Sequence, residues 1–413
     1  MSARWRVLAI MTTAQAGASL VQQALGALSP ALVATFALSK AQLGAIFTAV
    51  MVGATCFTAL SGVLTDRWGE RKMLLVSAVV MTAALVAATA VQQYWWLVAT
   101  LAIYGAGYAS GTPAGGRAIL AWFDRDRGLA MGIRQTGVSV GGLAGALAFP
   151  IVAMYGGYRA ALVFAALLIV VTSGAAYLLY RQASEEGAEV GSFIDIARGM
   201  RTLARDPRLI AVTLTCMLLG ATQFIMNGFV TITAVADVRT SADVAGLALA
   251  VAFVTAICGR LGWGYLSDRY LGGDRLIPLA VICVLAAVGT AMLALLGAGA
   301  VVPLFVASAL LGLTASGWNG LMAAALSEVG GTERAASALG LGLTAMFAAS
   351  AAGPSLFGAL ADHTSLAAAW AILSAIVLLG VIPPIWLLRH LELLRQAQDL
   401  GDLVPVPRAN EGP

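Results

Sequence analysis

The sequence carries little charge. Only 11% of its 413 residues are Asp, Glu, Lys or Arg, whereas 60% are hydrophobic. Because about one quarter of the residues in a soluble domain are charged, this composition excludes an ordinary soluble protein and predicts an integral membrane protein. The net charge of +4 is small and the basic residues are not clustered, which argues against a nucleic-acid partner.

Histidine and cysteine are also scarce. The two histidines lie at the ends of apolar segments, and the four cysteines lie inside such segments without metal-ligand spacing or a disulfide framework. The sequence has no H-E-x-x-H motif, no paired-aspartate site and no ATP-binding loop. We therefore expect no cofactor, no metal and no enzymatic activity, and any pumping must be driven by a gradient.

Long apolar runs account for most of the chain. A membrane-spanning helix needs about 20 predominantly apolar residues, and twelve segments of that kind are present. They lie near 8–36, 41–64, 72–91, 94–122, 128–153, 158–180, 208–236, 243–266, 276–298, 301–326, 335–361 and 365–388.

These segments predict an all-α integral membrane protein of 12 transmembrane helices in two pseudo-symmetric six-helix bundles. The bundles cover 1–180 and 208–388, joined by a linker at 181–207 and followed by a polar tail at 389–413, which we expect to be disordered. The linker contains SFIDIARGMRTLARD, which fits either a basic helix on the membrane surface or a solvated linker helix.

The basic residues predict the orientation. Of 24 Lys and Arg residues, 18 fall on one side: at the N-terminus, in the loops after the even-numbered segments and in the tail. By the positive-inside rule, both termini and the linker are predicted to be cytoplasmic, in an inner or plasma membrane.

A loop motif is repeated in the two halves. GVLTDRWGERK at 62–72 follows the second segment, and GYLSDRYLGGDR at 264–275 follows the eighth. The two copies share a glycine, an aspartate and an arginine, each pair separated by 202 residues. Two halves with the same loop chemistry predict an internally duplicated transporter.

The first copy of this motif resembles the signature loop of the major facilitator superfamily. The matching residues are Gly62, Asp66, Arg67, Gly69, Arg71 and Lys72, and Asp268 and Arg269 belong to the second copy. The resemblance spans all twelve segments and implies that this loop latches the cytoplasmic side of the outward-open state. Charge-assisted bonds around Asp66 fit such a latch. The alternative is a rigid turn whose basic residues only fix the topology.

Arg260 is a permanent cation inside an apolar segment. It lies eight residues before Asp268, about 12 Å inside the membrane on a helix, and no acidic residue can be placed deep in any span. A guanidinium at that depth should face a partner, and a substrate carboxylate would suit it. GRLGWGYLSDR also resembles the eighth helix of oxalate/formate antiporters and monocarboxylate transporters, which implies that Arg260 binds carboxylate. The alternative is bonding to backbone carbonyls of a broken helix.

Two further arginines lie in spans. Arg134 shares a helix face with Gly137, Gly141 and Gly145, and this segment partly resembles an antiporter motif whose glycines pack the fifth helix on the eighth. Val138 replaces the motif's proline. We expect Arg134 to point toward Arg260, with snorkelling to the surface as the alternative. Arg117 is predicted to act at the cytoplasmic gate, toward Glu333 or Asp124.

Four segments carry polar stripes. They are the first, fourth, seventh and tenth, which the superfamily resemblance implies line the central cavity. We predict a substrate site formed with Arg260 and Arg134 by Gln15, Tyr104, Tyr108, Gln223, Asn227, Trp318 and Asn319. For any one of these residues the alternative is an interhelical hydrogen bond.

These features predict a secondary transporter that moves a small organic anion, a mono- or dicarboxylate, by anion exchange or proton-linked uptake. We expect a monomer whose partners are the substrate and the lipid bilayer. RQTGVSVGG and GPSLFGALAD (353–362) also resemble cyanate-type permeases, so an inorganic anion such as cyanate or nitrate is an alternative. A multidrug efflux pump is a second alternative, but a pump for cations should carry an acidic residue in its cavity.

Overall fold

The computed structural model describes residues 3–123, 127–180 and 205–403, and these are helical with short connections. For some residues inside the helices, including Gly62, Asp66 and Thr112, the backbone is described but the contacts and exposure are not. The linker sequence SFIDIARGMRTLARD, Asp124 and the side chain of Glu333 also lie outside the description.

The first half of the chain, residues 3–180 (the N half), contains six crossings. They are formed by α1 (Ala3–Ala24) with η1 (Leu25–Leu28) and α2 (Ser29–Phe36), α3 (Lys40–Trp68), α4 (Glu70–Ala90), α5 (Tyr94–Trp122) and α6 (Arg127–Leu179). α6 supplies two crossings because Gly156 and Gly157 leave helical geometry between them, with Gly157 at a φ of 65° that favours glycine.

The second half, residues 205–403 (the C half), repeats this arrangement. It contains α8 (Pro207–Ala236), α9 (Ala242–Tyr270), α10 (Leu276–Ala294), α11 (Val301–Leu313), α12 (Asn319–His363), α13 (Leu366–Leu379) and α14 (Ile382–Leu403). The tenth crossing is broken between α11 and α12, and α12 continues into the eleventh. All twelve predicted segments therefore fall on helices, and nine of the described helical stretches are by themselves long and apolar enough to cross a membrane.

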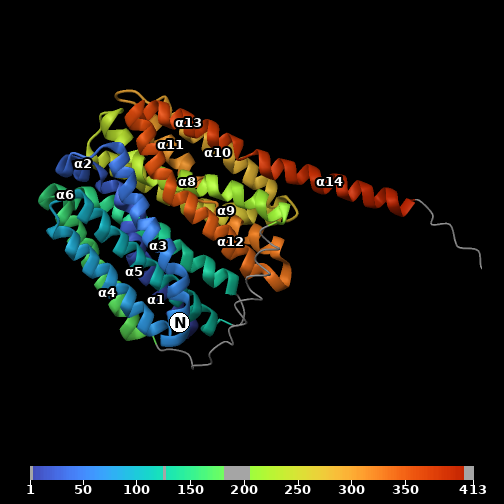
Figure 1. Cartoon of the computed structure of the whole chain (residues 1–413), viewed down its shortest axis with the longest axis horizontal. Coiled ribbons are helices and arrows are strands. Elements are labelled where there is room, and N and C mark those ends of the chain that lie inside the picture. The colour runs from blue at the N-terminus through green and yellow to red at the C-terminus, as the bar shows by residue number, and fades with distance from the viewer. Residues whose placement is uncertain (1–2, 124–126, 181–204, 404–413) are drawn as a thin grey trace, which may run out of the picture.

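The prediction for the tail is wrong up to Leu403, and residues 404–413 lie outside the description. The chain after Arg389 was expected to be disordered, but α14 continues to Leu403 and projects away from the bundle (Figure 1). The sequence LELLRQAQDL is rich in residues with high helix propensity, so nothing ends the helix where the apolar segment ends.

The two halves lie side by side and have two distinct ends (Figure 1). We call the end with the connections at 37–39, 91–93, 237–241, 295–300 and 364–365 the distal end, and the other the basic end. Between described residues, hydrogen bonds join the halves at Ser29, Lys40, Ala41, Thr48, Asn227 and Thr231 in the distal part, and at Arg260 deeper in the molecule.

The seams between the halves follow the internal repeat. Gly44 of α3 and Gly246 of α9 are separated by the same 202 residues as the loop motifs. A Cβ at Gly44 would lie 2.2 Å from the Pro354 carbonyl oxygen of α12, and one at Gly246 would lie 2.6 Å from Pro150 of α6. Helices in membranes pack closely through small residues of this kind.

Candidate functional site

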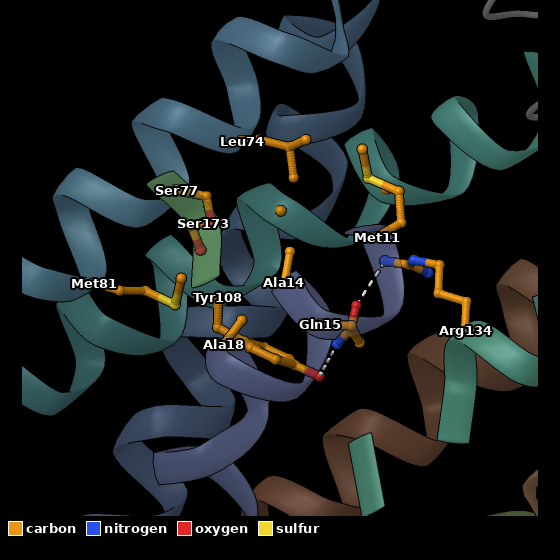
Figure 2. Close-up of a pocket in the computed structure, with 12 residues that line it drawn as sticks. Met11, Ala14, Gln15, Ala18, Leu74, Ser77, Met81, Tyr108, Arg134 and Ser173 are labelled. Carbon is orange, nitrogen blue, oxygen red and sulfur yellow. Dashed lines mark hydrogen bonds between the residues drawn. The ribbon is translucent and has the colours of Figure 1, made fainter. Parts of the chain in front are cut away.

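Arg134 is buried in the N half. Its side chain extends from α6 to α1, where one terminal nitrogen donates a hydrogen bond of 2.6 Å to Gln15 Oε1, and only 2% of the residue is exposed. Gln15 Nε2 in turn donates to Ser19 Oγ at 3.0 Å and to the Tyr108 hydroxyl at 3.3 Å. Figure 2 shows the row of Arg134, Gln15 and Tyr108, which couples α6, α1 and α5.

The glycine stripe beside Arg134 faces a different helix from the predicted one. A Cβ at Gly141 would lie 2.1 Å from the Ala16 carbonyl oxygen of α1, and one at Gly137 would lie 2.6 Å from that of Thr12. The expectation that this stripe packs on the eighth helix is therefore wrong, because α1 occupies it. Arg134 shares the stripe's face, so it points to α1. Of the neighbouring glycines, Gly142 contacts Phe253 of α9.

A small cavity lies next to Arg134. α1, α4, α5 and α6 line it, with Gln15, Ser77, Tyr108, Arg134 and Ser173 as its polar side chains (Figure 2). The centre of a water molecule can occupy about 20 Å³ of this cavity, so the cavity has room for about one water molecule. All of its lining residues belong to the N half.

Arg260 joins the two halves through backbone carbonyls. Its Nε donates to the Ser316 carbonyl at 3.2 Å, and its Nη1 donates to the Gln135 carbonyl of α6 at 3.1 Å. Ser316 lies in the break between α11 and α12, so this bonding is the alternative that the sequence left open. The residue is half-buried.

The break between α11 and α12 is held by side chains. Asn319 Nδ2 donates to the Ser316 carbonyl at 3.0 Å, and Trp263 Nε1 donates to the Leu313 carbonyl at 2.8 Å. Trp318 Nε1 donates to the Ala315 carbonyl, and its side chain is completely buried. In this structure Asn319 is half-buried and shares the Ser316 carbonyl with Arg260, whereas Trp318 is packed inside the C half.

Other predicted site residues form interhelical hydrogen bonds. The Tyr104 hydroxyl is buried and donates to the Ala18 carbonyl, so this residue packs α5 on α1 and does not line a site here. Asn227 is likewise buried and donates to Gln23 Oε1 at 2.9 Å, linking α8 to α1. Gln223 lies one turn nearer the basic end on α8 and is 5% exposed.

The loop motif of the N half binds to its own half. Arg71 Nε donates to the Tyr177 carbonyl at 2.9 Å, and its guanidinium lies over the Tyr177 ring. Gly69 ends α3 at a φ of 80°, a conformation that favours glycine. Arg67 and Lys72 are exposed.

Arg117 has a different carboxylate partner from those predicted. Its Nε lies 3.5 Å from Glu70 Oε2, and Glu70 Oε1 accepts a hydrogen bond of 2.7 Å from the Tyr180 hydroxyl. The proposed partners Glu333 and Asp124 lie outside the described side chains, so that prediction stays untested, and Glu70 is an additional partner within the N half. Glu70 is only 2% exposed, so its charge needs such partners.

The second copy of the motif is also paired within one half. Arg275 lies 2.6 Å from Asp268 Oδ1 and 3.0 Å from Glu328 Oε1, and it donates to Ser267 Oγ at 2.8 Å. Arg269 is exposed. Neither loop, in its described residues, forms a hydrogen bond or ion pair with the other half. The described side chains of the two loops therefore do not form the predicted latch in this structure, and the side chain of Asp66, at the centre of that prediction, lies outside the description.

Comparison with known proteins identifies the family. The model of the Major Facilitator Superfamily matches residues 11–239 and 212–407, which together cover almost the whole chain. The protein belongs to the Major Facilitator Superfamily. It is therefore a secondary transporter that works by alternating access, and not an enzyme.

Two relatives with similar sequences are transporters of the same superfamily. An uncharacterised MFS-type transporter of Mycobacterium tuberculosis is 28% identical over 78% of this chain and 71% of its own length. The MFS transporter asaE of Aspergillus flavus is 27% identical over 65% of this chain and 59% of its own length.

Solved structures of the superfamily share the fold. A bacterial homologue of the human lysosomal transporter Spinster matches with a TM-score of 0.72 at 15% identity, covering 93% of this chain and 96% of that one. The nucleoside transporter NupG matches with a TM-score of 0.74 at 15% identity, covering 93% and 98%. These similarities confirm the predicted fold of this superfamily member.

Three residues of this transporter were missed in the sequence. Glu70 stands at a position that the loop motif leaves open, so the motif did not single it out. Gln23 and Asp362 each bond to the other half, through Asn227 and through the start of α3. The signal for Asp362 lies in GPSLFGALAD, the stretch that resembles cyanate-type permeases. Gly358 and Asp362 are four residues apart there, so they share one face of a helix.

Proposed function

We propose that the protein transports a small organic anion, a mono- or dicarboxylate, by anion exchange or proton-linked uptake. The observation that carries the proposal is that cations from opposite halves come together at α6: Arg260 of α9 donates to the carbonyl of Gln135, the residue that follows Arg134. Alternating access moves a substrate between two halves, so a site with a cation from each is suited to an anion.

Arg260 is the primary contact for the anion in this proposal. Its two described acceptors are neutral carbonyls, which do not compensate the charge of the guanidinium. A carboxylate can accept two parallel hydrogen bonds from that group, which makes it a stronger partner than either carbonyl. Arg260 is half-buried and Arg134 is 2% exposed, so an incoming solute meets Arg260 first.

Arg134 has a supporting role. Its bond to the Gln15 carbonyl oxygen orients the amide, whose nitrogen donates to the Tyr108 hydroxyl. Gln223 and Asn319 complete the proposed site. Tyr104, Trp318 and Asn227 are placed around it as packing residues in this conformation.

We further propose that the basic end is cytoplasmic and that the protein acts as a monomer in the inner or plasma membrane. The positive-inside rule supports this orientation. The distal end, where the halves are joined by hydrogen bonds, then faces outward. The loop residues Asp66, Arg67, Asp268 and Arg269 would form the cytoplasmic latch in the other state.

The test is a thermal-shift screen of the purified protein against mono- and dicarboxylates, repeated with Arg260→Ala. A ligand that binds only the folded protein raises the melting temperature by mass action. At a concentration of 100 times its Kd, it adds about 2.7 kcal/mol to the free energy of unfolding. We expect stabilisation of the wild type and none of Arg260→Ala. Arg208→Ala, which removes an exposed cation near the start of α8, is the matched control and should respond like the wild type. Equal stabilisation of all three proteins would contradict the proposal.

A small inorganic anion is the second candidate. The cavity beside Arg134 has room for about one water-sized group, which favours a compact ligand over a bulky one. Cyanate and nitrate therefore belong in the same screen. If they stabilise the protein and carboxylates do not, the second candidate replaces the first.

A further inference from the structure

The N-terminus of α3 receives a carboxylate from the other half of the molecule. Asp362, near the end of α12, accepts hydrogen bonds from the backbone nitrogens of Lys40 at 2.9 Å and Ala41 at 2.7 Å. The Lys40 ammonium lies 3.7 Å from the same carboxylate. Lys40 and Ala41 begin α3, and their N–H groups have no partner within that helix.

The local sequence leaves these two donors for Asp362. Ser39 caps α3 from within the N half, but its hydroxyl accepts from Gln42, the third residue of the helix. The two caps therefore divide the first three donors between them. The partial positive charge of a helix N-terminus also attracts a carboxylate. The ion pair to Lys40 adds little, because it is long and its partners are 36% and 26% exposed.

The helices below Asp362 fit closely enough to hold the carboxylate in place. A Cβ at Gly358 would lie 2.2 Å from the Lys40 carbonyl oxygen, so only glycine allows α12 this close to α3. Further along this seam, Thr48 of α3 bonds to Ser355 Oγ, one helical turn from Gly358, and to the Ala351 carbonyl, two turns from Gly358. Asp362 thus stands at the distal end of a continuous seam between the halves.

The repeat-related seam between α9 and α6 has no such cap. Gly246 packs against Ala146 and Pro150 there, as Gly44 does against Pro354. The position equivalent to Lys40 is Ala242, and in the described residues no side chain from the N half bonds to the start of α9. The carboxylate cap is therefore an addition to one seam and not a by-product of the duplication.

We propose that Asp362 is the gate residue of the distal end: it holds this end closed by capping α3 across the two halves, and it leaves the cap when the end opens. Alternating access requires the distal contacts to break in the opposite state, so a contact that exists only in one state biases the equilibrium toward it. Loss of a helix cap changes such an equilibrium by about 5- to 30-fold. This inference does not depend on the nature of the substrate.

Labelling of a single cysteine from each side tests the proposal. The four native cysteines are replaced by alanine, and Gln223→Cys places a reporter on the site side of the Asn227–Gln23 bond. A membrane-impermeant maleimide is then applied to vesicles of each orientation. We expect Asp362→Ala to raise the labelling rate from the distal side by about 5- to 30-fold without raising it from the basic side. Unfolding would raise both rates, so a loss of structure is distinguished from an opened gate.

Two further variants and one control make the test independent of a single substitution. Lys40→Pro removes one of the two donors at a position where proline is favoured, so distal labelling should rise less than in Asp362→Ala. Gly358→Ala should raise distal labelling, because the added methyl group pushes α12 away from α3. Asp243→Ala removes an acidic residue at the same end, from the first turn of α9, and should leave the distal labelling rate unchanged. The proposal is overturned if distal labelling of Asp362→Ala stays within about twofold of the reporter protein, or if Asp243→Ala raises it equally.

Discussion

The contact of α6 with α1 at Gly141 yields the sharpest stability prediction. A Cβ at this position would lie 2.1 Å from the Ala16 carbonyl oxygen and 3.0 Å from its carbon, both backbone atoms that cannot rotate away. Gly141→Ala must therefore push the two helices apart by about 1 Å or more. Overpacking of this kind costs about 1–3 kcal/mol. The displaced helix carries Gln15, so the bond of 2.6 Å to Arg134 should also lengthen.

The matched control lies on the same helix. A Cβ at Gly132 meets nothing within 4 Å, so Gly132→Ala should be neutral or stabilise the helix by about 0.5–1 kcal/mol. We expect the two variants to differ by about 1–4 kcal/mol in thermal unfolding of the detergent-purified protein. If carboxylates stabilise the wild type, Gly141→Ala should also bind them more weakly. Equal melting temperatures for the two variants would show that α1 and α6 are not packed as closely as described.

Three further predictions concern polar contacts. Arg117→Ala should lower the melting temperature more than Glu70→Gln. The first variant leaves the 3%-exposed Glu70 carboxylate without its cation, whereas in the second the 28%-exposed Arg117 can turn to water. A larger loss in Glu70→Gln would contradict the pairing. Arg275→Ala should cost about 1 kcal/mol, in a salt-sensitive way, since its two acidic partners are exposed, and a loss unaffected by salt in the melting curve would argue against an electrostatic origin. Tyr104→Phe should destabilise by about 1 kcal/mol with unchanged ligand affinity, whereas Tyr108→Phe should weaken anion binding; a titration in which both behave alike would remove Tyr108 from the site.

The internal duplication explains which features of the two halves correspond. Gly44 and Gly246 occupy equivalent positions on equivalent seams, and both loop motifs pair their charges inside their own half. The differences between the halves are the functional candidates. Arg260 has no arginine equivalent near position 58, where the sequence has Thr58, and the Asp362 cap has no counterpart on α9.

The sequence by itself determined the membrane class, the twelve crossings and the family. These depend on local properties, namely runs of about 20 apolar residues and a motif of eleven consecutive residues, which need no distant contact. It also identified Arg260 and Arg134 as cations inside membrane spans, because the cost of a charge in a membrane is independent of the packing details.

Only the tertiary structure decided where those side chains point and what they bind. Arg134 faces α1 because that helix fills the glycine stripe, and nothing in the stripe itself distinguishes α1 from α9 as the occupant. Glu70 is buried because Arg117 and Tyr180 reach it from two other helices. Asp362 caps a helix whose first residue lies 322 positions earlier in the chain. Such contacts join segments that are distant in sequence, and helical periodicity fixes only which residues share a face, not which helix the face meets.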